Sequence, residues 1–152
     1  MSNIPDGFKP ITSSHPFGAM VGPLYHKQIG DGPDDWVRGF LVEKKHCNRI
    51  GFCHAGMLSF FGDVILGQSF WNHGHGPCVT MQIDNHHIWP VRHGDWIQGN
   101  SKIVKLEGDV ENHKGIVHIE AHSFVENHKV MINHGVHRQI NRRSGAWEDF
   151  PK

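Results

Sequence analysis

The sequence predicts an α+β fold in which one antiparallel sheet wraps around a single long helix. One observation is a proline-free segment, residues 55–71, whose apolar side chains run almost all round a helix, as in a buried helix. The other is the series of strand-like segments after it, joined by turns so short that neighbouring strands must be antiparallel. A helix that is apolar all round and a sheet with one apolar face are complementary surfaces.

The expected elements follow one another along the chain. Residues 1–20 contain three prolines and are interpreted as a loose arm or a short cap. The sequence GDGPDD at residues 30–35 predicts a turn, and the alternation in residues 36–45 predicts a strand. The sequence NHGHGP at residues 72–77 ends the helix. The remaining strands are expected at residues 79–88, 96–106, 116–125 and 130–140.

Length and charge limit the class of protein. A chain of 152 residues is enough for one domain with a hydrophobic core. We expect this domain over residues 21–141, between the arm of residues 1–20 and a polar tail of residues 142–152. The 15 Lys and Arg residues balance 15 Asp and Glu residues, so the chain lacks the positive field that gathers DNA or RNA. Nucleic acid is therefore not an expected partner.

Cysteine usage and the first residues indicate a cytoplasmic protein. Cys47, Cys53 and Cys78 show no C-x-x-C spacing, which fits reduced thiols better than a disulfide framework or a zinc ribbon. The first 20 residues have neither the basic nor the apolar region of a signal peptide. The longest apolar run, residues 57–66, is shorter than the roughly 20 residues that span a bilayer, so no membrane partner is expected.

An aspartate in the middle of the apolar helix needs an explanation. Asp63 stands between Phe61 and Val64 in the predicted helix. An isolated buried carboxylate costs several kcal/mol or takes up a proton, so a carboxylate kept under that strain is a candidate functional group. The alternative is that Asp63 lies at an exposed edge of the helix or pairs with an arginine.

The segment around this helix resembles a known family of enzymes. The sequence NRIGFCHAG at residues 48–56, with Asp63 seven residues beyond its last glycine, is similar to the hotdog-fold acyl-CoA thioesterases of the phenylacetyl-CoA type. Members of that family show Asn, Gly, His-Gly-Gly and then Asp or Glu at this spacing. The resemblance extends from about residue 22 to residue 140. The chain departs from the family at Ala55, which replaces the first glycine, keeps the backbone N–H and adds a methyl that could narrow the acyl slot.

The resemblance implies a hydrolase that converts acyl-CoA and water into a free acid and CoA. It makes Asp63 the base that activates water, or the nucleophile. If the helix starts near Ala55, the N–H groups of residues 55–57, including Gly56, point at the thioester carbonyl together with the positive end of the helix dipole. No cofactor is expected, because CoA is part of the substrate.

Other residues of the motif have a functional and an ordinary interpretation each. Asn48, in the loop before the helix, either helps to place the thioester or the water or is a turn asparagine. His54 is interpreted with Gly51 as part of the structure of the active-site loop, and the alternative is a general base. Thr80, on the next strand, either orients water near the carboxylate or is an ordinary strand threonine.

The resemblance also implies an obligate homodimer. In the family the catalytic carboxylate comes from one protomer and the helix N-terminus from the other, so the sites lie at the interface. Whether two dimers assemble into a homotetramer is left open. Binding of CoA in this fold usually uses surface cations, and the candidate pool here is Arg49, Arg92, Lys102, Arg138 and Arg142.

The 15 histidines raise the alternative of a metal site. Pairs at suitable spacing for a transition metal are His73/His75, His86/His87 and His118/His122. The last pair shares its strand face with Glu120 and Glu126, as solvated residues do, and the sequence holds no tight Cys/His motif. We therefore expect no metal.

Two rival functions remain open. One is a hotdog dehydratase or hydratase, which uses a histidine and a helix carboxylate on acyl thioesters; its histidine usually lies in a proline-rich loop, whereas no proline separates His54 from Asp63. The other is a non-catalytic acyl-CoA-binding hotdog protein. The acyl group is not specified, since the aromatic residues of the helix serve equally well as a slot or as core: Phe60, Phe61, Phe70 and Trp71.

Overall fold

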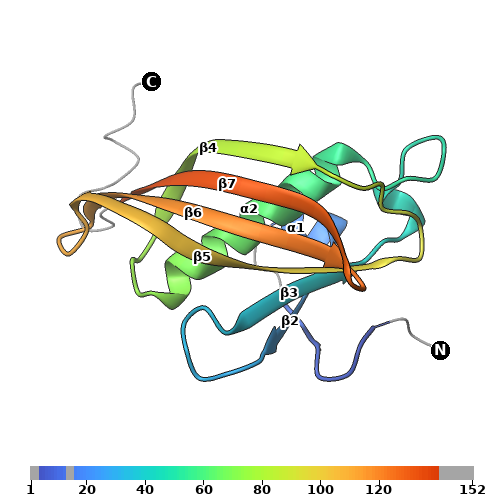
Figure 1. Cartoon of the computed structure of the whole chain (residues 1–152), viewed down its shortest axis with the longest axis horizontal. Helices are drawn as coiled ribbons and strands as arrows, with labels where there is room; N and C mark the ends of the chain where they lie inside the picture. The colour runs from blue at the N-terminus through green and yellow to red at the C-terminus, as the bar shows by residue number, and fades with distance from the viewer. Residues whose placement is uncertain (1–3, 13–15, 141–152) are drawn as a thin grey trace.

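A computed structural model describes residues 4–12 and 16–140 and places one long helix against an antiparallel sheet (Figure 1). The strands are β1 (Lys9–Pro10), β2 (Tyr25–Gln28), β3 (Trp36–Leu41), β4 (Cys78–His87), β5 (Trp96–Asp109), β6 (Lys114–Val125) and β7 (His128–Gln139). The helices are α1 (Pro16–Val21), the short 3-10 helix η1 (Lys44–His46) and α2 (Ala55–Asn72). The predicted α+β hotdog architecture is confirmed.

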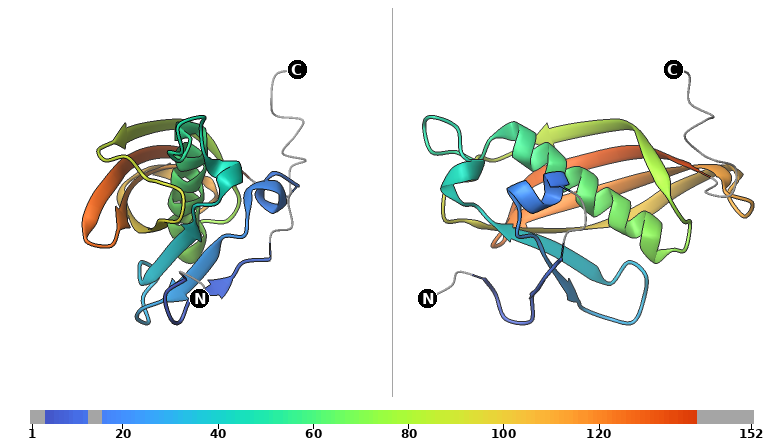
Figure 2. Two further views of the ribbon diagram at one scale, coloured as in Figure 1. Left: turned by 90° about the vertical axis from the view of Figure 1, so that its right-hand side faces the viewer. Right: turned by 180° about the vertical axis from the view of Figure 1, so that it is seen from behind.

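The sheet is ordered β1-β2-β3-β5-β6-β7-β4, and every neighbouring pair is antiparallel. It curls around α2, which lies along its concave face (Figure 2). Strand β4 follows α2 directly in the chain but, among the described residues, pairs only with β7, so it forms one edge of the sheet. This edge borders the middle of α2, where Asp63 lies.

The core fills the space between α2 and the central strands. Phe61, Leu66 and Phe70 of α2 and Phe40 of β3 are 0% exposed. Strand β6 turns apolar residues inward, as its alternation predicted, but the inward row of β7 is largely polar. After the apolar Met131, that row is Asn133, Gly135, His137 and Gln139. The helix therefore meets a polar strip where an apolar one was expected.

The prediction that α2 is buried on every side is wrong for the single chain. Phe60, Asp63 and Val64 are only half-buried, and Trp71 is 54% exposed. The physical reason is that the sheet ends at β4 and covers only part of the helix circumference. Phe61 and Phe70 belong to the core, whereas Phe60 packs edge to face against a neighbour from α1 at 4.9 Å between ring centroids.

The N-terminal region contains more structure than a loose arm. Residues 9–10 form β1 and pair with β2, with Lys9 opposite His26, and residues 16–21 form α1. The predicted tail, residues 142–152, lies outside the described residues. No helix in residues 4–12 and 16–140 has the length and apolar character needed to cross a membrane.

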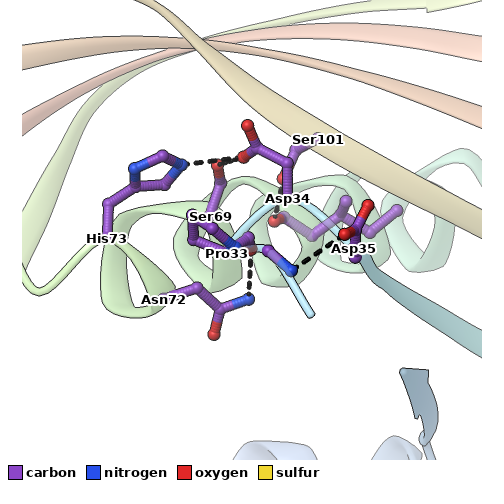
Figure 3. A network of polar contacts seen from close by, with 9 residues as sticks. Pro33, Asp34, Asp35, Ser69, Asn72, His73 and Ser101 are labelled. Atoms are coloured by element: carbon purple, nitrogen blue, oxygen red, sulfur yellow. Dashed lines mark hydrogen bonds and ion pairs between the residues drawn. The ribbon is translucent and has the colours of Figure 1, made fainter. Parts of the chain in front are cut away.

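The C-terminal end of α2 is tied to the connection between β2 and β3 (Figure 3). Asp34 Oδ1 lies 2.8 Å from His73 Nε2 and accepts a hydrogen bond of 3.3 Å from Ser69 Oγ. The side-chain amide of Asn72 donates to the carbonyl oxygen of Pro33 at 3.0 Å. These contacts fix the predicted turn at residues 30–35 against the helix and set the direction of α2 across the sheet.

Candidate active site

The N-terminus of α2 is capped by His54. Its backbone is extended (φ −63°, ψ 136°), and its ring Nδ1 accepts the N–H of Gly56 at 2.9 Å. Its carbonyl oxygen accepts the N–H groups of Met57 and Leu58. Of the three N–H groups of residues 55–57 that were expected to point at a ligand, that of Ala55 has no partner among the described residues and the other two are bound by His54. Capping consumes the other two, which is the usual way helix ends are satisfied.

The loop before His54 is shaped by Asn48. Its Oδ1 accepts the backbone N–H groups of Ile50 and Phe52 at 3.1 and 3.2 Å, as a turn asparagine does. Gly51 in this turn has φ +87°, a conformation that favours glycine. The other half of the Asn48 amide, Nδ2, has no hydrogen-bond partner in the described part of the chain. The loop thus presents an exposed amide donor a few residues before the helix start.

Asp63 lies at the open edge of α2 with partners on both neighbouring strands. Its side chain is 41% exposed, and its Oδ1 accepts a 2.8 Å hydrogen bond from Thr80 Oγ1 of β4. His137 Nε2 of β7 lies 3.9 Å from the same oxygen, an ion-pair distance that is too long for a hydrogen bond. No donor among the described residues reaches Oδ2.

The electrostatics of this group favour an ionised carboxylate. Burial acts to raise the pKa of Asp63, but the interactions with His137 and Thr80 outweigh it and leave that pKa below its usual value. Asp63 is therefore negatively charged at neutral pH, with one oxygen held and the other free. This is the state that a general base or a carboxylate nucleophile requires.

A second set of polar contacts lies beside this one. Asn85 of β4 donates to Ser59 Oγ of α2 at 3.0 Å, and Asn133 of β7 donates to Asn85 Oδ1 at 2.5 Å. Both sets follow the pairing of β4 with β7, which places Thr80 opposite His137 and Asn85 opposite Asn133. We call these six residues the polar seam: Ser59, Asp63, Thr80, Asn85, Asn133 and His137. The seam runs between α2 and the sheet edge.

Sequence reasoning named Asp63 and Thr80, which the structure brings into contact, but it did not name His137, Asn85 or Asn133. The available signal was the alternation of β7, in which Asn133 and His137 lie four residues apart on the same face. Gln139 continues that face and is buried too. Polar residues on the inward face of a strand point to a site when an apolar row would serve the core better.

The remaining candidates of the sequence stand apart from the seam. No group of three or more His, Cys, Asp or Glu residues in the described ranges is placed to hold a metal ion. His118 lies 2.8 Å from Glu107 and His122 lies 3.2 Å from Glu120, so these two histidines face carboxylates on the outer side of the sheet. Of the candidate cations for CoA, the first four are exposed and the fifth lies outside the described residues: Arg49, Arg92, Lys102, Arg138 and Arg142.

Comparison with known proteins identifies relatives of this arrangement. No family model matches the chain. A curated Pseudomonas aeruginosa protein described as a putative esterase is 33% identical over 108 residues, which cover 70% of this chain and 79% of that protein.

Solved structures with the same fold include two from Thermus thermophilus. One has a TM-score of 0.68 at 19% identity, and the match covers 84% of this chain and 100% of that chain. The other is a variant of the phenylacetic acid degradation protein PaaI, with a TM-score of 0.67 at 18% identity, covering 83% and 100% of the two chains. A hypothetical thioesterase of Streptococcus pneumoniae, solved with coenzyme A, has a TM-score of 0.65 at 17% identity and covers 87% and 94%.

The sheet wrapped around α2, with a helix carboxylate at its open edge, defines a protein of the hotdog thioesterase class. The esterase relative covers most of both chains, and the solved structures share the fold. The chain belongs to the same family as the Pseudomonas aeruginosa esterase relative and has the hotdog fold of the solved thioesterases, in line with the resemblance of its sequence.

Proposed function

We propose that the protein hydrolyses acyl-CoA thioesters to a free acid and CoA in a homodimer. In each site Asp63 of one protomer acts together with the N-terminus of α2 from the other. The family supports a thioester hydrolase, and the coenzyme A in the Streptococcus pneumoniae structure supports CoA as the thiol portion of the substrate.

The observation that carries the proposal is the distance along α2. Ala55 and Asp63 are eight residues apart on one helix, which is about 12 Å at a rise of about 1.5 Å per residue. A reacting carbonyl must lie about 3 Å from both the oxyanion donor and the attacking group. One chain cannot provide both, whereas two antiparallel copies of α2 side by side bring the start of each helix to the middle of the other.

The surface for such pairing is present. Strand β4 has no partner on its outer side in the described residues, and unpaired edges are normally covered or blunted. Met81 on this strand is 55% exposed and Trp71 of α2 is 54% exposed. Pairing β4 with a second β4 would bury this edge together with the uncovered side of α2.

The chemistry follows from the two ends of this site. Asp63 Oδ2 removes a proton from water, the water oxygen attacks the thioester carbon, the C–S bond breaks, and the CoA sulfur takes up a proton. A variant of this path has Asp63 attack the carbon directly, so that the C–S bond breaks, the CoA thiolate leaves and a mixed anhydride forms, which water then hydrolyses to the free acid and Asp63. The Ala55 N–H of the partner, at the positive end of the helix, stabilises the oxyanion, a contribution of about 3 kcal/mol for a donor of this kind.

The remaining residues hold these groups in place. Thr80 fixes Oδ1 and leaves Oδ2 free, and the Asn48 Nδ2 donor positions the thioester or the water. Gly56 keeps the cap intact, since a Cβ there would lie 3.1 Å from His54 Nδ1. No cofactor enters this scheme.

Mixed dimers test the proposal. Ala55→Pro removes the oxyanion N–H at the first helical position, where proline is well tolerated, and the extended backbone of His54 suits a following proline. Asp63→Asn removes the attacking carboxylate. Each variant alone should release little thiol from acyl-CoA substrates, and a refolded equal mixture should recover about one quarter of wild-type activity, because half the dimers are mixed and each holds one intact site.

The outcomes separate the alternatives. A mixture as inactive as its components would place both groups in one chain or outside the chemistry and would refute the shared site. Hydration of an enoyl-CoA by the wild-type protein without thiol release would favour a hydratase. Binding of acyl-CoA with neither reaction would indicate a binding protein.

A further inference from the structure

His137 is a buried imidazole without a hydrogen bond. It lies near the C-terminal end of β7 with 1% of its side chain exposed, and neither ring nitrogen has a hydrogen-bond partner among the described residues. Its ring packs near Phe70, at 6.1 Å between centroids, and a Cβ on Gly135 would lie 2.7 Å from its Cε1. Buried polar groups are normally hydrogen-bonded, so this exception requires a reason.

The charged group that His137 faces is Asp63. Its Nε2 lies 3.9 Å from Asp63 Oδ1, the oxygen that Thr80 also contacts. The other titratable group that interacts with this carboxylate in the described residues is the Cys78 thiol of β4. Burial and the charge of Asp63 raise the pKa of that thiol to about 11, so it is neutral near neutral pH. His137 is therefore the titratable side chain that can stabilise negative charge on Asp63.

We propose that His137 is a positioning residue for the proposed hydrolysis. It keeps Asp63 ionised, attracts Oδ1 toward β7 and leaves Oδ2 free to react. The inference rests on the proposed function. A nearby N–H or cation favours the charged form of a carboxyl group. Because the core surrounds the imidazole, it has no path to turn toward water, and its effect stays directed at Asp63. The consequence is an enzyme that retains activity at lower pH than an unassisted aspartate would allow.

The sign of the effect can be measured in the pH profile. The attacking form of Asp63 is the carboxylate, so kcat/KM falls as pH drops through the pKa of this group. His137 lowers that pKa, and its removal should raise it. In His137→Phe the acidic limb of the kcat/KM profile should shift to higher pH by about one pH unit or more. In His137→Gln, which keeps an N–H donor, the shift should be smaller, and kcat above the limb should stay within about threefold of wild type.

A matched control is His73→Gln. His73 also contacts an aspartate through Nε2, at 2.8 Å from Asp34, but it has no contact with Asp63. The acidic limb of this variant should coincide with that of the wild-type protein. A carbon-13 NMR titration of the Asp63 carboxyl, assigned by its absence in Asp63→Asn, reads the same pKa without turnover and should show the same upward shift for His137→Phe.

The design separates failure of this inference from failure of the proposed function. Wild-type turnover by Asp63→Asn would overturn the proposed chemistry itself. An inactive Asp63→Asn together with an unshifted limb and an unshifted carboxyl titration in a folded His137 variant would overturn the role of His137 alone. If His137→Phe does not fold, His137→Gln carries both readouts, and an unshifted carboxyl pKa there overturns the inference.

Discussion

Two sets of residues at helix α2 have the same composition, which is an aspartate, a histidine and a hydroxyl side chain, but their geometries differ. In each set the hydroxyl donates to Oδ1 of the aspartate and the histidine presents Nε2 to that oxygen. At the end of the helix the histidine lies at hydrogen-bond distance from the aspartate, and we call this set closed. At the middle of the helix the histidine lies farther from the aspartate, and we call this set open. Their members are Asp34, Ser69 and His73 in the first and Asp63, Thr80 and His137 in the second.

The difference lies in the histidine. In the closed set His73 is 27% exposed and sits 2.8 Å from its aspartate, so both partners are satisfied (Figure 3). In the open set His137 is 1% exposed and sits 3.9 Å away. A solvated pair contributes little net stability, whereas an unsatisfied buried polar group costs about 1–3 kcal/mol. A closed pair fastens a loop to a helix, and an open pair keeps a charged oxygen available for chemistry.

The largest expected difference between the sets is in catalysis. Asp63→Asn should lower kcat by about two orders of magnitude or more with little change in KM, because the lost interaction is one of the reaction and not of uniform binding. Asp34→Asn should leave kcat within about threefold and lower the free energy of unfolding by less than about 1 kcal/mol, as expected for a solvated pair. Thiol release and denaturant unfolding measure the two quantities. Comparable losses of kcat in both variants would show that the contrast is wrong.

The two hydroxyls should show a smaller contrast. Thr80→Val keeps the branched shape but frees Oδ1 of Asp63 to rotate, and kcat should fall by about tenfold, as for a misplaced rather than a missing base. Ser69→Ala removes a buried hydroxyl and should cost about 1 kcal/mol of stability with unchanged kcat. The same two assays apply. If Thr80→Val kept full turnover, Thr80 would be an ordinary strand residue.

Much of the fold could be predicted from the sequence because its elements are long and strongly patterned. The helix expected at residues 55–71 is observed as Ala55–Asn72, and the four strands after it are displaced by at most three residues at either end. Strands β1 and β2 were missed because they have two and four residues, and the sequence YHKQ of β2 shows no apolar alternation. Pairing with β3 decides the conformation there, and local preference does not.

The site was predictable only where it is local in sequence. Asp63 and the loop of residues 48–56 belong to one continuous motif. His137 reaches Asp63 through the register of β7 on β4, which contains a bulge between Thr80 and Gln82, and no spacing in the sequence encodes that register. The number of free N–H groups at residues 55–57 was overestimated, because His54 accepts the N–H of Gly56 with its ring and that of Met57 with its carbonyl oxygen.

The smallest expected effect is a change in folding stability between two pH values, and it is caused by histidines outside the closed and open sets. Burial lowers the pKa of His46, which is 4% exposed, and the same cause lowers the pKa of His26, His75 and His122. A lowered folded pKa means that the unfolded chain binds protons first, so stability falls as pH drops below the unfolded value of about 6.5.

The denaturant midpoint should therefore decrease from pH 8 to pH 5.5. His46→Gln tests the assignment. It should lower the midpoint at pH 8, because the ring bridges Glu43 N–H and the Val21 carbonyl oxygen, yet make the dependence on pH shallower than in the wild-type protein. The lowered pKa of Asp63 acts in a separate window, since its stabilisation is complete above about pH 4 and is lost below it. If the denaturant midpoint depended equally on pH in the wild-type protein and in His46→Gln between pH 8 and 5.5, His46 would not contribute to the effect. The more exposed histidines would then be its source.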